Sequence, residues 1–263
     1  MRRTDLLAPD LIKTNLRTKR IAREVVVYNS TASTNDVAAE YAANPANDGL
    51  VVFAEEQTAG RGRAGNRWCS GRSDSILCSV VLAGRVCGAE LLSLTCAVAV
   101  AEAIGKTADA QARIKWPNDI HLKNKKVAGI LLESKANNGG SSYIIGIGIN
   151  CHQNKASFTG ALADTATSID IAGGVICDRV SLARRLLTSL DYWIELAGRK
   201  GAQVVDRWSE LSVQLGHRIT VVYNGRKFAG HCTGLDPQKG LILRLDTGGI
   251  RIFDAAHTTI ARD

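Results

Sequence analysis

Proline (4 residues), methionine (1) and aromatic side chains (5%) are scarce among the 263 residues, and no low-complexity tract or internal repeat is present. Apolar residues make up 45% of the chain and charged residues 22%, which excludes a disordered protein. The N-terminus has no apolar segment of the kind that a secretion signal requires. The longest apolar run, residues 91–104, contains Ser93, Thr95 and Glu102, so we expect it to be too short and too polar to span a membrane. The sequence therefore predicts a globular, cytoplasmic protein.

Close pairs of metal-binding residues are also absent. The seven cysteines include no C-x2-C pair, and the five histidines include no His-x-x-x-His pair. An odd number of cysteines favours free thiols, and Cys78 and Cys96 stand in apolar runs where a cysteine acts as a small core residue. We expect no metal held by a cluster of protein side chains.

Acidic residues are in deficit, since 33 Lys and Arg against 25 Asp and Glu give a net charge of +8. The basic residues concentrate in residues 17–23, 61–72 and 123–126, and solvated surface alone would explain the first and third of these clusters. No G-x-x-x-x-G-K-[ST] motif occurs, so a phosphate ligand would not be bound in the P-loop manner. Charge alone leaves nucleic acid, a phosphate-bearing ligand and an acidic protein open as partners.

Hydrophobic periodicity predicts an α+β fold with a sheet meander at its centre. Ser33 and Asp36 have the S-x-x-D spacing of a helix start, and the pattern of residues 152–174 indicates a loop. Strands are predicted at residues 25–28, 50–54, 76–82, 112–115, 120–122, 127–133 and 143–150, and helices at 37–43, 89–104, 181–197 and 202–215, the last followed by Gly216 at a C′ position.

From His217 onward the pattern changes to short alternating strands with turn signals every eight to ten residues, roughly what a small all-β barrel shows. We therefore expect two domains, a catalytic domain over residues 1–215 and a β-barrel over residues 216–263.

Residues 60–68, GRGRAGNRW, combine three glycines, three arginines and a tryptophan. Glycine permits unusual backbone angles and close approach, and each guanidinium is a fixed cation with a planar donor fork. The composition is typical of a loop that closes over a flat, negatively charged ligand. RNA-binding RGG-like tracts are usually repeated, whereas this segment is single and lies between predicted strands.

Five motifs follow one another in the order STND (33–36), AEEQTAGRGRAGNRW (54–68), KWPNDI (115–120), KKVAGILLE (125–133) and GIGIN (146–150). Together with the terminal barrel they resemble the biotin protein ligase family from about residue 10 to the end of the chain. The resemblance implies a mixed β-sheet with flanking helices, as in class II aminoacyl-tRNA synthetases and biotin ligases, and an SH3-like barrel at the C-terminus. It also implies an enzyme that activates biotin with ATP and Mg²⁺ to biotinyl-5′-AMP. The biotin would then be transferred to a lysine of the biotin carboxyl carrier protein of acetyl-CoA carboxylase or a related enzyme.

The resemblance also implies roles for individual residues. The biotin-binding residues would be Ser33, Thr34, Asn35, Gln57, Arg61, Gly62, Arg63, Lys115, Gly129, Gly146 and Gly148. The first four would line the ureido group, whose neutral donors and acceptor suit hydroxyl and amide side chains. The glycines would leave room for the ligand in the wall of the pocket.

The remaining roles concern the nucleotide and the reaction. ATP would be bound by Arg63, Trp68, Asn118 and Asn150, with the indole beside the adenine. Lys115 and Arg63 would be catalytic, Lys115 at the reacting carboxylate and α-phosphate. Asp119 and Glu133 are carboxylates that could help to hold Mg²⁺.

Two departures from the family pattern stand out. Asn66 replaces an arginine that many relatives carry, and the adjacent Arg67 could substitute for it. Some members begin with a winged-helix DNA-binding domain, but only about 24 residues precede the first predicted strand here, too few for a helix-turn-helix module. We therefore expect the monofunctional form without specific DNA binding, as a monomer or homodimer. A lipoate or octanoate ligase or transferase of the same superfamily, and a basic nucleic-acid-binding regulator, are the alternatives.

Overall fold

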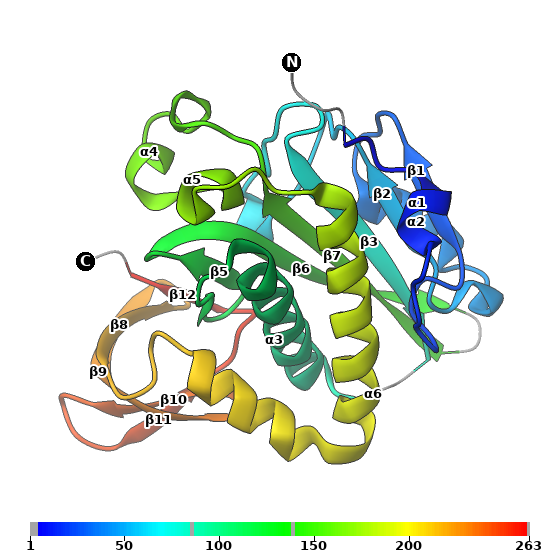
Figure 1. The fold of residues 1–263 in the computed structure, drawn as a ribbon. Helices are drawn as coiled ribbons and strands as arrows, with labels where there is room; N and C mark the ends of the chain where they lie inside the picture. The colour runs from blue at the N-terminus through cyan, green and yellow to red at the C-terminus, as the bar shows by residue number, and fades with distance from the viewer. Residues whose placement is uncertain (1–4, 85–86, 138–139, 262–263) are drawn as a thin grey trace.

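This computed structural model describes residues 5–84, 87–137 and 140–261. A seven-stranded sheet forms the centre of the molecule, and a second, five-stranded sheet follows it (Figure 1). The first sheet consists of β1 (Val25–Tyr28), β2 (Val51–Ala54), β3 (Ser75–Ala83), β4 (Arg113–Lys115), β5 (Asp119–Leu122), β6 (Lys125–Asn137) and β7 (Gly140–Asn150) in the order β1-β2-β3-β7-β6-β5-β4. Only the β1–β2 pair is parallel, and β4 to β7 form the predicted meander.

The helices are α1 (Pro9–Lys13), α2 (Thr34–Tyr41), α3 (Ala89–Ala108), α4 (Leu162–Thr165), α5 (Ile169–Gly173) and α6 (Arg179–Leu211), with 3-10 turns at Pro45–Asn47, Arg63–Gly65 and Lys155–Ser157. Thus the segment 152–174, predicted to be a loop, contains a 3-10 turn and two short helices. α3 and α6 lie side by side on one face of the sheet (Figure 1), where the odd-numbered Val51 and Phe53 point into the main core. The intervening Val52 packs on the other face, under α2.

The expectation that residues 91–104 are too short and too polar for a membrane span is wrong by length and composition. α3 has 20 residues. Among the described residues it is a helix that is long enough and apolar enough to cross a membrane. However, 67% of its most apolar window is buried inside the structure. The helix is therefore accounted for as a core helix that packs against the sheet and against α6.

The predicted pair of helices at 181–197 and 202–215 is one element with a kink. Lys200 has a non-helical backbone (φ −140°, ψ 55°), and α6 ends at Leu211 rather than at residue 215. Beyond the helix, Val213 N–H donates to the carbonyl of Ile114 in β4, at 3.0 Å. Gly216 consequently lies outside the helix C-cap, although its φ of +81° does use the freedom of glycine.

The second sheet consists of β8 (Arg218–Tyr223), β9 (Arg226–Asp236), β10 (Gly240–Leu245), β11 (Ile250–Phe253) and β12 (Thr258–Ile260), all antiparallel, in the order β11-β10-β9-β8-β12. The strand β12 was missed by the sequence prediction. This arrangement is consistent with the predicted SH3-like domain. The two sheets lie on either side of the predicted boundary at residues 215 and 216, which stays a prediction.

A buried ion cluster fastens the N-terminal segment to the core. The Arg179 side chain has 0% exposure and donates to Glu55 Oε2 at 2.9 Å and Asp5 Oδ1 at 3.0 Å. His152 lies between Asp5 (3.2 Å) and Asp170 (2.9 Å). The hydrogen bond that His152 donates to Asp5 raises the pKa of His152 to about 9, against the effect of burial, and Asp170 adds to the rise.

The seven cysteines are thiols rather than halves of disulfides, as expected, and Cys78 and Cys96 are fully buried.

Candidate active site

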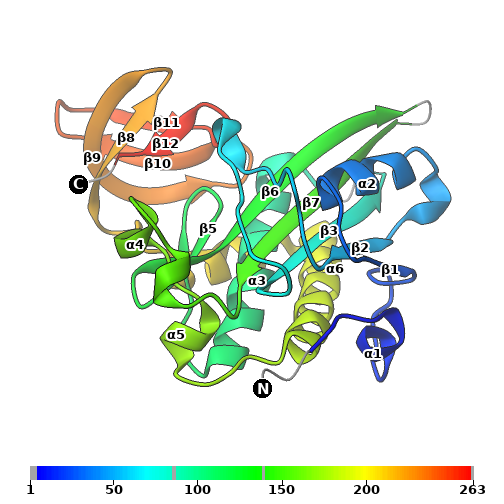
Figure 2. The same ribbon diagram turned by 90° about the horizontal axis from the view of Figure 1, so that it is seen from above.

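The predicted site residues meet on the face of the sheet that carries α2, opposite α3 and α6. Figure 2 shows the segment between β2 and β3, which contains the glycine–arginine loop, crossing β6 and β7 on this face. Gly146 and Gly148 of β7 face the site, whereas Ile145, Ile147 and Ile149 alternate with them into the main core. Because successive side chains of a strand point to opposite faces, alternate residues of β7 line the core and the site.

A buried polar cluster occupies the start of α2. Gln57 Oε1 accepts hydrogen bonds from Thr34 N (2.7 Å) and Thr34 Oγ1 (3.0 Å). Ser33, Thr34 and Asn35 are each 3% exposed. The structure thus brings together the four residues predicted for a ureido group.

The helix start predicted from the spacing of Ser33 and Asp36 is confirmed, but the capping box that this spacing suggests does not form. Ser33 occupies the N-cap position, but its side chain makes no capping hydrogen bond. Asp36, the expected partner of the box, pairs instead with Arg61 at 2.7 Å. The Asp36 carboxylate thus contacts the Arg61 guanidinium, and the Ser33 hydroxyl is not used in capping the helix.

Ser79 of β3 completes the cluster and was missed by sequence reasoning. Its Oγ lies 2.7 Å from Thr34 Oγ1 and 2.6 Å from Asn35 Oδ1. Asn35 Oδ1 has no proton, so the single hydroxyl proton of Ser79 goes to it, and Thr34 Oγ1 donates to Ser79 or Gln57. The lone pairs of Thr34 Oγ1 then suit an N–H donor of a ligand. The available signal was one serine inside the apolar strand pattern of residues 76–82.

The glycines of the site make room for side chains of the same chain. A β-carbon on Gly148 would lie 2.5 Å from the indole of Trp68, and one on Gly129 would lie 3.2 Å from it. A β-carbon on Gly146 would lie 2.3 Å from Asn35 Oδ1. Trp68 Nε1 is buried without a hydrogen-bond partner among the described residues. The indole therefore lies on the glycine wall itself, and its place beside the adenine stays a prediction.

Arg61 and Arg63 of the loop have different partners. Arg61 pairs with Asp36 and Glu133, and the hydrogen bond with Asp36 raises its pKa. Arg63 donates to Asn118 Oδ1 at 3.3 Å and to the carbonyl of Ala255 in the second sheet's last turn. Burial lowers the pKa of Arg63 below its ordinary range without removing the charge of a guanidinium.

A tight turn gives the loop its shape. Gly62 N–H donates to the carbonyl of Asn66 at 2.7 Å, and Ala64 and Gly65 both have positive φ. Asn66 Nδ2 donates to the carbonyl of Arg63 at 2.8 Å, so this departure from the family pattern closes the turn. The exposed Arg67 reaches the carbonyl of Thr58 at 3.5 Å.

Lys115 ends β4 directly opposite Asp119. Asp119 pairs with Lys126 at 2.7 Å, whereas the Lys115 ammonium has no ion pair or hydrogen bond within the described part of the chain. The corner after Lys115 is held by a residue that sequence reasoning missed, because Gln214 accepts from Trp116 N (3.0 Å) and donates to Trp116 O (3.1 Å). A buried amide thus fixes the backbone beside this cation.

Two further predicted ligands have hydrogen-bond partners of their own. Asn150 is 6% exposed and donates to the carbonyl of Thr167 at 3.0 Å. Asp119 lies opposite Gly129 of β6, and Glu133 is four residues further along that strand. Glu133 instead belongs to the cluster around Asn35. The two carboxylates suggested for Mg²⁺ are therefore not brought together, and no group of three or more His, Cys, Asp or Glu side chains within the described residues could hold a metal ion.

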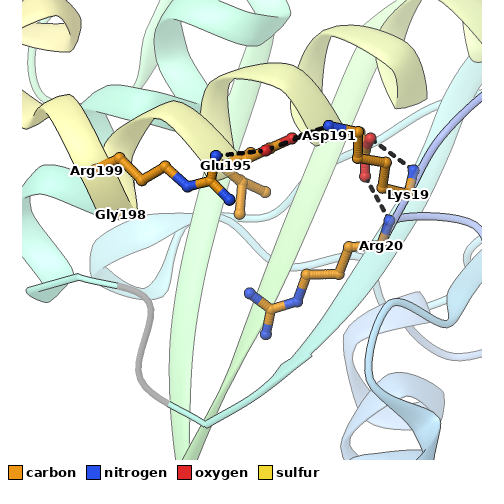
Figure 3. Close-up of a pocket in the computed structure, with 7 residues that line it drawn as sticks. Lys19, Arg20, Asp191, Glu195, Gly198 and Arg199 are labelled. Atoms are coloured by element: carbon orange, nitrogen blue, oxygen red, sulfur yellow. Dashed lines mark hydrogen bonds and ion pairs between the residues drawn. The ribbon is translucent and has the colours of Figure 1, made fainter.

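A pocket of about 380 Å³ lies elsewhere, against α6 (Figure 3). It is lined by Lys19, Arg20, Asp191, Ile194, Glu195, Gly198 and Arg199. Asp191 accepts from the backbone N–H groups of residues 19–21 at 2.8–2.9 Å, and Glu195 pairs with both Lys19 (3.0 Å) and Arg199 (3.2 Å). Its carboxylates are thus used in holding the N-terminal segment to α6, and we assign it no ligand.

Comparison with known proteins defines the class. Residues 27–150 match the biotin/lipoate A/B protein ligase family. The bifunctional ligase/repressor BirA of Bacillus subtilis is 32% identical over 253 residues, covering 95% of this chain and 78% of BirA. The biotin--[acetyl-CoA-carboxylase] ligase of Mycobacterium tuberculosis is 32% identical over 97% of both chains. The structure of the Aquifex aeolicus biotin protein ligase in complex with biotin and ATP has the same fold, with a TM-score of 0.80 at 23% identity over 92% of this chain and 100% of that one.

The fold is that of the biotin and lipoate ligases. Among these, the chain belongs to the biotin protein ligase family.

Proposed function

We propose that the protein activates biotin with ATP to biotinyl-5′-AMP and transfers the biotin to a lysine of an acceptor protein. The observation that carries this proposal is the hydroxyl and amide cluster of Thr34, Gln57 and Ser79. It lies beside the loop that carries Arg61 and Arg63. Neutral polar groups suit a urea, and cations suit a carboxylate and a triphosphate. Relatives of matching length are named as biotin ligases.

In the first step, a carboxylate oxygen of biotin attacks the α-phosphorus of ATP, and pyrophosphate leaves. Two anions must approach each other, so a preorganised cation at the reacting atoms lowers the barrier. Lys115 supplies this charge, because its ammonium is not neutralised by any carboxylate among the described residues. Arg63, anchored at Asn118, places a second cation at the phosphate end of the loop.

In the second step, the amine of the acceptor lysine attacks the acyl carbon, and AMP leaves. The mixed anhydride hydrolyses readily, so the loop must exclude water until the acceptor arrives. The turn at residues 62–66 and the indole of Trp68 would form this cover.

Mg²⁺ would arrive with the triphosphate and neutralise part of its charge. Asp119 fits as one oxygen ligand, but its pairing with Lys126 and the distance of Glu133 do not make a cage of protein carboxylates. This agrees with the chemistry of Mg²⁺, which usually keeps several waters and binds through one or two carboxylates and the substrate phosphates.

We further propose the biotin carboxyl carrier protein of acetyl-CoA carboxylase as the acceptor, since the M. tuberculosis relative is named for this substrate. A cytoplasmic location and a monomer or homodimer go with this role. The absence of specific DNA binding stays a prediction, which a gel shift at about 200 mM salt with operator-length duplexes would test.

The decisive experiment is exchange of labelled pyrophosphate into ATP with biotin, lipoate or octanoate as the acid. Biotin-dependent exchange that requires Mg²⁺ is expected. Exchange with lipoate or octanoate but not biotin would assign the protein to the other branch of the superfamily, and no exchange with any acid would reject the proposal.

A further inference from the structure

Arg61 has contacts that do not involve the reacting atoms. Its Nη1 lies 2.7 and 2.8 Å from the two carboxylate oxygens of Asp36, and its Nη2 lies 3.3 and 3.4 Å from those of Glu133. Asp36 belongs to α2 and Glu133 to β6. One guanidinium therefore fastens the glycine–arginine loop to both elements that frame the buried polar cluster.

Glu133 has a second partner on the buried side. Its Oε2 accepts from Asn35 Nδ2 at 2.5 Å, while the other end of the Asn35 amide accepts from Ser79 at 2.6 Å. A carboxylate can only accept, so this contact determines which end of the amide faces Ser79. Glu133 thus connects the orientation of a 3% exposed amide to the position of an exposed loop arginine.

We propose that Asp36 and Glu133 are positioning residues that hold Arg61 and so keep the loop closed over the adenylate, and that Glu133 also orients Asn35. The inference rests on the proposed function, because the adenylate is what a closed loop would protect. No catalytic step is assigned to either carboxylate.

A role of Arg61 as a direct ligand of the substrate would predict the opposite effect of the carboxylate variants. If Arg61 were a direct ligand of the anionic substrate, the two carboxylates would compete with that substrate, and neutralising them would strengthen binding. The structure favours positioning, because Glu133 is itself fixed by the buried Asn35 and Arg61 joins a contact that is already formed.

The test uses the full chain and the variants Asp36→Asn, Glu133→Gln and Glu133→Ala. Biotinyl-5′-AMP is formed without acceptor, and its loss is followed as release of AMP and biotin. Exposed ion pairs are weak, so Asp36→Asn and Glu133→Gln should each speed this loss by about two- to five-fold. Their KM for biotin should not change, because the amide oxygen that Glu133→Gln introduces can still accept from Asn35. Glu133→Ala should also raise the KM for biotin, since it frees the Asn35 amide.

Glu195→Gln is the matched control. Glu195 is 34% exposed and pairs with two cations, and Glu133 is 37% exposed and contacts one cation and one amide. Unlike Glu133, Glu195 lies in the pocket against α6. The Glu195→Gln variant should lose biotinyl-5′-AMP at the parent rate.

A double-mutant cycle separates positioning from general weakening of the fold. Arg61→Gln should speed adenylate loss, and adding Asp36→Asn to it should speed it no further, because the shared contact is already gone. Fully additive effects, or an adenylate that is lost at the parent rate or more slowly in Asp36→Asn and Glu133→Gln, would overturn the inference. If Glu133→Ala does not fold, these two isosteric variants decide alone. A parent protein that forms no adenylate would instead reject the proposed function.

Discussion

The indole of Trp68 lies so close to Gly148 that a β-carbon on that glycine would come within 2.5 Å of the ring. The contact joins the glycine–arginine loop to β7 and closes one side of the candidate site. Gly146 gives the same room to Asn35 on the same face of β7. The two-residue spacing of the glycines in GIGIN therefore matches the alternation of a strand.

Gly148→Ala should therefore push Trp68 off the sheet. Overpacking typically costs about 1–3 kcal/mol, so we expect biotin-dependent pyrophosphate exchange to fall by about tenfold or more, with a red shift of tryptophan emission as the indole meets water. Gly88→Ala is the control, since its new methyl group would meet nothing within 4 Å. Unchanged emission and exchange in Gly148→Ala would show that the indole does not rest there in solution.

Lys115→Ala should reduce biotinyl-AMP formation by about 10²–10³, the usual effect of removing one preorganised charge. Lys115→Arg should not restore the rate, because a planar fork cannot replace a compact ammonium. Transfer from added biotinyl-AMP to the acceptor should be affected less than adenylation. Lys125→Ala, at a lysine whose ammonium donates to the carbonyl of Ala163 at 3.4 Å, should behave as the parent. A folded Lys115→Ala variant with the parent rate would remove Lys115 from the chemistry.

Arg63→Ala should release the adenylate faster. The side chain loses charge-assisted hydrogen bonds to Asn118 and to the carbonyl of Ala255, and such bonds contribute about 1.5–3 kcal/mol. We expect at least a tenfold faster loss of biotinyl-AMP, seen as stray labelling of lysines in a bystander protein. Arg67→Ala, at the exposed end of the same turn, should not have this effect. Equal retention by parent and Arg63→Ala would show that Arg63 is not a clamp.

His152 should make the stability of the protein depend on pH. Its pKa is about 9 in the folded state, above the usual 6.5, so its contribution is fully present below about pH 6.5 and is lost as the pH rises through 9. His152→Gln should therefore be less stable than the parent at pH 6.5, by about 1–3 kcal/mol, and close to it at pH 9.5. Urea unfolding at the two pH values measures the difference, with the exposed His231→Gln as control. A deficit of His152→Gln that is equal at both pH values would show that the charge of His152 plays no part.

Much of the fold could be predicted from local pattern. The strand at residues 25–28 has the predicted bounds, and the strand pairs of the meander follow the predicted turns. The misses occur where a distant partner competes with the local signal. Ser33 and Asp36 have the spacing of a capping box, but Asp36 has Arg61 within reach, 25 residues along the chain.

The site shows the same limit. Motifs identified the loop, Lys115 and the glycines, but Ser79 and Gln214 belong to no motif. Each meets its partner only when segments far apart in sequence pack together, Ser79 against Asn35 of α2 and Gln214 against Trp116. Glu133 was recognised as a carboxylate, yet its role depends on the register of β6 against β7, which places it by Asn35 rather than by Asp119.

Gln214 lies between the end of α6 and the start of β8, where the chain passes from one sheet to the other. The connecting segment therefore does more than join the two sheets, because the side-chain amide of Gln214 holds Trp116 and the corner beside Lys115. A chimera that exchanged C-terminal sheets between ligases at this junction would replace part of the catalytic framework along with the graft. The modular unit for protein engineering accordingly begins after Gln214, and a donor sheet should be spliced downstream of it.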